Sequence, residues 1–131
     1  MFVATQYKID GTPDSVPEVV HISYDLWRLQ ITVAFEGQSQ PVYLSFTSVG
    51  FRVLDEGQLL DYWGKEERAP GWLWRMEAGG WFDQESERSG FLMGQFAKDG
   101  DRRPHEYLLL GINDCVSILS WGEPQVLLAE P

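Results

Sequence analysis

Cysteine is nearly absent from this sequence. Cys115 is the one cysteine among 131 residues, so no disulfide can form within the chain. Long apolar runs are absent too, because no stretch reaches the roughly 18 apolar residues that span a bilayer. The N-terminal sequence MFVATQYKIDGTPDSVPE lacks the basic start and the apolar segment of a signal peptide. These absences predict a cytoplasmic protein in a reducing compartment.

Basic residues are scarce. The chain has 10 Lys and Arg against 20 Asp and Glu, which gives a net charge of −10 and a pI near 4.5. Contacts with a nucleic-acid backbone or an anionic membrane need a positive surface, so neither partner is expected. A basic protein would be attracted by this charge, but the same charge can serve solubility alone. Composition leaves both interpretations open.

Recognisable catalytic and metal-binding motifs are also missing. His21 and His105 lie far apart, and no H-E-x-x-H or C-x-x-C pattern occurs, which argues against a zinc site. No glycine-rich phosphate loop is present, and residues 99–101 (DGD) lack the remaining ligands of a calcium loop. Cys115 is expected to be a structural thiol. The sequence therefore predicts a protein without enzymatic activity, cofactor or metal.

Apolar residues that alternate with polar ones dominate the first half of the chain, as in β-strands. The apolar positions are even-numbered over residues 20–26 and odd-numbered over residues 29–35. A one-residue slip moves every side chain to the other face of a strand, so a turn or bulge is expected at residues 25–28. A second switch after Phe46 predicts a bend at residues 47–50. One strongly curved antiparallel sheet would explain both switches.

The second half of the chain adds further predicted elements. Strands are expected over residues 106–110, 115–121 and 125–128. A short helix is expected near residues 55–64, because Asp55 can cap its first amides and Gly64 can end it. The predicted fold class is α+β, with this helix and a curved antiparallel sheet of about seven or eight strands. Whether the sheet closes partly into a barrel stays open at this point. No linker or repeat divides the chain, so residues 1–131 are expected to form a single domain.

Residues 71–88, GWLWRMEAGGWFDQESER, hold three of the six tryptophans. The Ala-Gly-Gly segment predicts a turn, and the halves on either side of it would form a hairpin in which Met76 lies opposite Phe82. In this register Trp72 and Trp74 lie with Met76 on the apolar face of one strand. They are expected to be core residues, with the lining of a cavity as the alternative.

Two acidic clusters adjoin aromatic residues in the predicted elements. In the hairpin, Trp81 shares a strand face with Asp83, Glu85 and Glu87. The helical segment contributes Asp55, Glu56, Asp61, Trp63, Glu66 and Glu67. Interface anchors are often Trp or Tyr ringed by polar groups, so these residues form the predicted partner-binding surface. A solvated acidic face without a partner is the alternative.

In size, charge and aromatic-acidic patches, the chain resembles the small acidic immunity proteins of bacterial toxin–immunity systems. The segments that carry the resemblance are residues 50–63 (GFRVLDEGQLLDYW) and 71–87. The resemblance implies a stoichiometric inhibitor that neutralises a basic toxin or effector protein, often a nuclease, by covering its active site or another essential surface. These proteins share no universal motif, so no residue roles carry over. Whether the protein is a monomer or a homodimer stays open.

A second function fits the same predicted fold. A sheet of about eight strands that closed into a barrel would hold a small apolar ligand, with the tryptophans lining its cavity. The inhibitor is the preferred prediction, and the ligand-binding barrel is the alternative.

Overall fold

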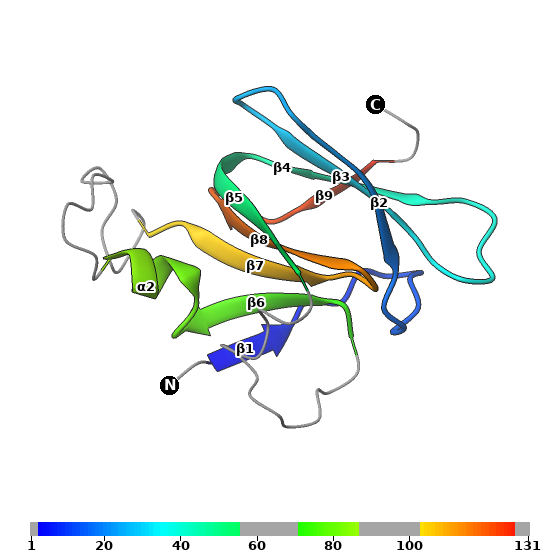
Figure 1. The fold of residues 1–131 in the computed structure, drawn as a ribbon, viewed down its shortest axis with the longest axis horizontal. Helices are drawn as coiled ribbons and strands as arrows, with labels where there is room; N and C mark the ends of the chain where they lie inside the picture. Colours follow the sequence, from blue (N-terminus) through cyan, green and yellow to red (C-terminus); the bar gives the residue numbers. More distant parts are fainter. Residues whose placement is uncertain (1–2, 56–70, 87–102, 128–131) are drawn as a thin grey trace.

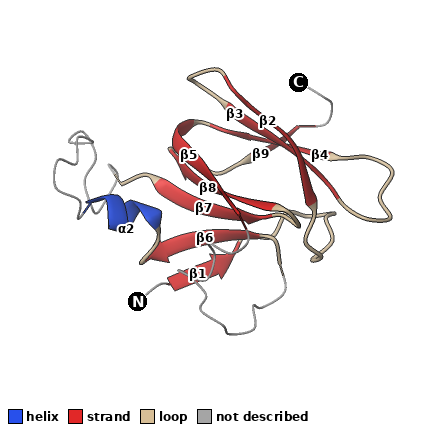
Figure 2. Ribbon diagram, in the orientation of Figure 1, coloured by secondary structure: helices blue, strands red, loops and turns tan. Residues whose placement is uncertain are grey.

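The computed structural model describes residues 3–55, 71–86 and 103–127. Within them the chain forms nine β-strands in two antiparallel sheets (Figure 1) and one short helix, α2 (Trp81–Ser86) (Figure 2). The strand order of the five-stranded sheet is β1 (Val3–Gln6), β6 (Leu73–Ala78), β7 (His105–Leu110), β8 (Asp114–Ser120) and β5 (Ser48–Asp55). The order of the four-stranded sheet is β2 (Glu18–Tyr24), β3 (Leu29–Ala34), β4 (Val42–Phe46) and β9 (Gln125–Leu127).

The main core lies between the two sheets. In β3 the alternate side chains of Leu29, Ile31 and Val33 are buried, as the two-residue period of a strand requires. They belong to one apolar cluster with Leu109 of β7 and Ile118 of β8, which are fully buried. The structure therefore confirms the antiparallel, strand-rich architecture that the alternating pattern predicts.

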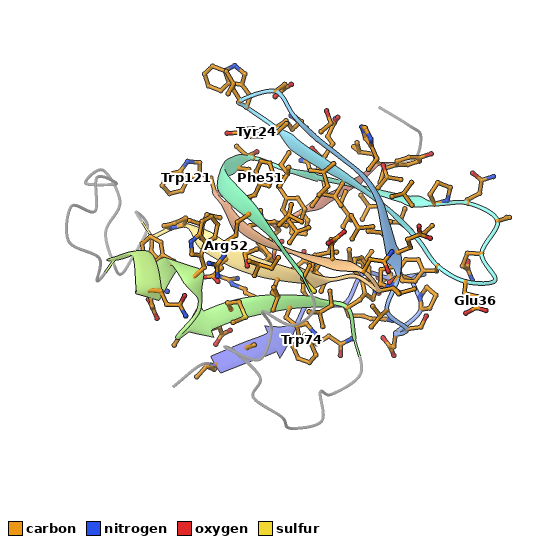
Figure 3. All side chains as sticks on the ribbon, in the orientation of Figure 1. Tyr24, Glu36, Phe51, Arg52, Trp74 and Trp121 are labelled. Carbon is orange, nitrogen blue, oxygen red and sulfur yellow. The ribbon has the colours of Figure 1, made fainter. Side chains whose placement is uncertain are left out.

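A second apolar cluster covers the opposite face of β7 and β8. It contains Leu54, Trp74, Met76, Leu108, Leu110 and Cys115 (Figure 3 labels Trp74). Because Leu108 and Leu110 alternate with Leu109, they point away from the core between the sheets. β7 is thus buried on both faces, which explains its nearly continuous apolar sequence.

The two expected core tryptophans are both buried, but in different clusters. Trp72 lies in the core between the sheets, where its ring centroid is 5.2 Å from that of Phe35. Trp74 lies in β6 and belongs to the cluster on the other face. The prediction that Trp72, Trp74 and Met76 share one strand face is wrong, because regular strand geometry begins only at Leu73. Both indoles fill packed clusters and line no barrel cavity.

The turn predicted at residues 25–28 is confirmed and joins β2 to β3. The Asp25 amide donates to the Arg28 carbonyl at 3.3 Å. Asp25 Oδ1 accepts hydrogen bonds from the amides of Trp27 at 3.0 Å and Arg28 at 2.8 Å. These two bonds hold the pKa of Asp25 below its usual value, and the bond from the Arg28 amide has the larger effect. The local Asp therefore determines the turn.

The bend predicted at residues 47–50 is the point where the chain changes sheet. β4 ends at Phe46 in the four-stranded sheet, and β5 begins at Ser48 in the five-stranded sheet. The Thr47 carbonyl between them accepts a hydrogen bond from the Trp121 amide at 3.0 Å. The expected single curved sheet is therefore wrong. The phase switch marks a change of sheet, and neither sheet closes into a barrel within the residues that the structure describes.

The hairpin predicted over residues 71–88 is also wrong. β6 pairs with β1 on one side and with β7 on the other. Met76 consequently lies opposite Ala4 and Glu106, and not opposite Phe82. The strand after the glycine turn is replaced by α2.

The helix forms because a distant carboxylate caps its first turn. Glu106 accepts hydrogen bonds from the amides of Trp81 at 2.8 Å and Phe82 at 2.9 Å. Such amides at the start of a helix have no partner within the helix. Gln84 then donates to the Gly80 carbonyl at 3.2 Å, which closes the first helical turn. Trp81, Asp83 and Glu85 therefore lie in a helix and do not form the predicted strand face.

Several predicted features lie outside the described residues. They are the helix near residues 55–64, which would follow Asp55 at the end of β5, and the side chains of Glu56, Asp61, Trp63, Glu66, Glu67 and Glu87. Among the described residues, none of the helical structure is long and apolar enough to cross a membrane.

Candidate functional site

The tip of the β2–β3 hairpin exposes two large apolar side chains. Trp27 is 82% exposed and Leu26 is 76% exposed, the two highest values among the large apolar side chains that the structure describes. The hairpin extends beyond the two sheets at the top of Figure 1. Leu26 has a φ of +82°, a conformation that a bulky side chain rarely adopts. Such local strain persists when the surrounding bonds over-determine it, and it concentrates at functional sites.

Two further aromatic residues extend this exposed region. The Tyr24 ring, 38% exposed, packs edge-on against Phe51 of β5 with a centroid distance of 5.2 Å. Trp121 is 42% exposed, and its backbone amide bonds to the carbonyl of Thr47, which lies between β4 and β5. Figure 3 shows Tyr24, Phe51 and Trp121 at the same end of the molecule. We call Tyr24, Leu26, Trp27 and Trp121 the aromatic surface.

The base of the hairpin is held by Arg28. Its Nη1 donates to Ser45 Oγ of β4 at 3.2 Å and to Gln125 Oε1 of β9 at 3.5 Å. Together with the Asp25 turn, these contacts fix the direction in which the tip projects. The backbone of the turn is therefore held in one conformation before a partner binds, which reduces the backbone entropy that binding must remove.

β5 connects the aromatic surface to α2. Phe51 faces Tyr24, whereas the adjacent Arg52 lies on the other face of the strand, with its guanidinium carbon 4.9 Å from the centre of the Trp81 ring. Trp81 is half-buried, and its indole also lies over Gly50. Each face of this strand therefore carries an aromatic contact, and Trp81 forms a second, less exposed aromatic position.

The carboxylate of Asp83 is used within the protein. Its Oδ2 accepts the Gly79 amide at 2.7 Å, and its Oδ1 lies 3.1 Å from Arg103 Nη2. The Arg103 guanidinium also stacks over the Phe82 ring at 4.7 Å. Of the residues in the predicted acidic strip, Asp83 is thus bound to the fold, and Glu85 is placed in α2.

Glu106 is the most deeply buried described carboxylate, with 4% of its surface exposed. Burial raises the pKa of Glu106 above its usual value, while the bonds from Phe82 and Trp81 and the charge of Arg52 act in the opposite direction. Gly80 lies so close to this carboxylate that a Cβ at that position would collide with its oxygens. The start of α2 therefore requires both a glycine and an acid.

A cavity of about 290 Å³ opens beside β6 and the start of β7. Its lining consists of Arg75, Met76, Glu77, Arg103, Pro104, His105 and Glu106. We call it the Arg75 cavity. It contains charges of both signs, so net charge alone does not define its ligand.

The structure does not unite the described carboxylates into one acidic face. The exposed residues Asp10, Glu18, Glu36, Asp114 and Glu123 lie on different elements. The sequence interpretation missed Leu26, Trp27 and Trp121. A signal was present, because Leu26 and Trp27 fall inside the predicted turn, and turns lie on the surface.

No family model matches the chain, and comparisons with curated proteins and with solved structures find no match either. Among the described residues, no group of three or more His, Cys, Asp or Glu side chains is placed to hold a metal ion.

Proposed function

We propose that the protein is a non-enzymatic inhibitor that binds a basic protein partner through its aromatic surface. The observation that carries the proposal is the exposure of Trp27 and Leu26 at a turn whose amides bond to the Asp25 carboxylate. Large aromatic side chains dominate binding energy at protein interfaces. Burying one such side chain contributes about 1.5–3 kcal/mol.

The charge of the chain favours a cationic partner. The net charge is −10, and two of the described basic residues already pair with aspartates: Lys8 with Asp14 at 2.8 Å and Arg103 with Asp83 at 3.1 Å. Long-range attraction would accelerate encounter with a basic protein, and added salt would slow it. The aromatic surface would then set the lifetime of the complex.

Trp81 provides a secondary contact in this proposal. It is half-buried beside Arg52, so a partner would cover a smaller part of it than of Trp27. Asp83 supports α2 and is not counted as a free contact. The resemblance to immunity proteins is consistent with this function, and a toxin with nuclease activity belongs to the proposed class of partner.

Affinity capture from the cell of origin tests the proposal. The bait is compared with Trp27→Ala and with the control Ile112→Ala, which removes another exposed apolar side chain at the β7–β8 turn. We expect one basic protein that is retained at low salt, released at high salt, and lost with Trp27→Ala alone. Its activity should fall to zero at a 1:1 ratio of the two proteins. Equal capture by both variants would place the interface elsewhere, and a captured protein that remains active would reject inhibition.

A further inference from the structure

The Arg75 cavity contains polar atoms that the fold leaves without partners. Arg75 lies in β6 directly opposite Tyr107 of β7. Its guanidinium makes no hydrogen bond or ion pair with another described residue, although the side chain is half-buried. His105 Nδ1 is buried in the cavity lining without a hydrogen-bond partner among the described residues, and so is the hydroxyl of Tyr107, which lies outside the lining. A buried polar group without a partner costs about 1–3 kcal/mol, so each one calls for an explanation.

The other charged groups of the cavity already have partners. Glu106 accepts the two amides of α2, and Arg103 pairs with Asp83. Glu77 accepts a long hydrogen bond from Thr5 Oγ1 at 3.4 Å. The groups that remain are Arg75, which only donates, and His105, whose neutral imidazole offers one donor and one acceptor. Most of the unused hydrogen-bonding capacity of the cavity is thus the set of donors on the Arg75 guanidinium.

We propose that the Arg75 cavity binds a small oxyanion, a carboxylate or phosphate group carried on a compact apolar body. The planar guanidinium of Arg75 matches the two oxygens of such a group. His105 would supply a further donor beside Arg75, while Met76 and Pro104 offer apolar wall for the body of the ligand. The volume of about 290 Å³ lies at the lower end of small-molecule pockets, which restricts the ligand to a compact molecule.

Tyr107 does not line the cavity but lies directly opposite Arg75, two residues after His105. It is fully buried, and burial raises the pKa of its hydroxyl to about 12, so the group stays protonated at neutral pH. Its ring packs edge-on against Tyr7 at 5.6 Å and lies 6.4 Å from the His105 ring. Tyr107 therefore orients the wall of the site and is treated as a positioning residue.

Negative charge near the site works against an anion. Glu123 acts on His105, Tyr7 and Tyr107, and Glu77 lines the cavity itself. Glu106 also lines the cavity, and Asp83 lies beside it in its pair with Arg103. Burial first, and then Arg75, lower the pKa of His105, while Glu123 raises it. An anion bound beside His105 would favour the protonated imidazole, so affinity should rise as the pH falls toward mildly acidic values.

Titration followed by ¹H–¹⁵N NMR tests this site without the proposed protein partner, so its outcome is independent of the inhibitor function. Benzoate and phenyl phosphate are the probes, and benzyl alcohol carries the same ring without a charge. We expect saturable shifts of the Arg75 side chain and the His105 imidazole with at least one anion, and none with the alcohol. The anion that binds more tightly identifies the preferred head group.

Four variants sharpen the test. Arg75→Gln should weaken binding about tenfold or more, because hydrogen bonds to charged groups contribute about 1.5–3 kcal/mol. Arg75→Lys keeps the charge without the planar guanidinium, so its affinity should lie between that of the wild type and that of Arg75→Gln. Glu123→Gln should tighten binding, and Tyr107→Phe should weaken it mildly. Absence of saturable shifts with both anions, equal shifts with benzyl alcohol, or unchanged binding in a folded Arg75→Gln protein would overturn the proposal.

Discussion

Two turns in this protein carry a tryptophan two positions from an aspartate, and the tryptophan is exposed in one and half-buried in the other. At residues 25–28, Asp25 binds the amides of Trp27 and Arg28, and the indole is left in solvent. At residues 79–83, Asp83 binds the Gly79 amide, and Trp81 lies half-buried against Arg52.

The difference lies in where each turn finds its hydrogen-bond partners. The first turn is satisfied by its own aspartate and tolerates a leucine at φ +82°. The second turn depends on Glu106 from another strand and uses glycine, with φ +75° at Gly79. A turn that is satisfied locally is free to project into solvent, whereas a turn completed by a distant strand is drawn onto the sheet.

The largest expected effect concerns the second turn. Gly80→Ala should lower the free energy of unfolding by about 2–3 kcal/mol, because the new Cβ would collide with the buried Glu106 carboxylate. Gly122→Ala is the matched control, since nothing lies within 4 Å of its Cβ position. Urea denaturation of both variants measures the difference. Similar values for the two would show that α2 is not held against Glu106.

The next effect is a dependence on pH. Burial raises the pKa of Glu106 above its usual value of 4.5, so the folded protein binds this proton more tightly than the unfolded chain. The contribution of Glu106 to stability is therefore largest below pH 4.5 and is lost as the pH rises through the folded-state pKa. Glu106→Gln cannot ionise, so the variant does not lose this stability as the pH rises. The free energy of unfolding of the variant minus that of the wild type should increase from acidic to neutral pH in parallel urea series. A constant difference would mean that the carboxyl has an ordinary pKa.

A smaller effect on stability is expected from the residue that each turn places at positive φ, which is Leu26 in the first turn and Gly79 in the second. Leu26→Gly should stabilise the protein by about 0.5–1 kcal/mol, because relief of a left-handed leucine exceeds the entropy lost with glycine. Gly79→Ala should do the reverse and destabilise by about 1 kcal/mol at φ +75°. Thermal unfolding of both variants checks the contrast, and a destabilised Leu26→Gly protein would show that the leucine packs against the fold.

The smallest effect on stability is expected at the exposed indole. Trp27→Ala should change the free energy of unfolding by less than about 0.5 kcal/mol, because its side chain is 82% exposed. Trp81→Ala should cost more, since it removes the stacking on Arg52, which contributes about 0.5–1 kcal/mol. Affinity for the proposed partner should show the opposite order, with the larger loss for Trp27→Ala. If Trp27→Ala unfolds the protein, the indole has a structural role.

Local patterns predicted the elements whose causes are local. The alternation of Leu29, Ile31 and Val33 identified β3, and the phase switch before it located the turn at residues 25–28. The same reasoning found the bend near Thr47, but it had no means of knowing that the chain changes sheet there. Two strands with opposite phase are equally compatible with one bulged sheet and with two packed sheets.

Distant partners explain what the sequence could not show. α2 depends on Glu106, which follows Trp81 by 25 positions, so the sequence around residues 81–86 contains no pattern that predicts the contact. For the candidate site, the acidic residues drew attention to residues 81–87, although Asp83 serves to hold α2. The exposed pair at residues 26–27 was identifiable in principle, because a turn places two large apolar side chains where no core can reach them.

β5 also has a consequence for the evolution of the chain. Phe51 and Arg52 are neighbours, yet one contacts Tyr24 between the sheets and the other contacts Trp81 on the opposite side. Gain or loss of one codon within this strand would exchange their positions and direct a guanidinium into the interior. We therefore expect an inserted residue to disrupt the fold within β5 and to be tolerated at the turns of Gly37 and Gly122, where a side chain would meet open space.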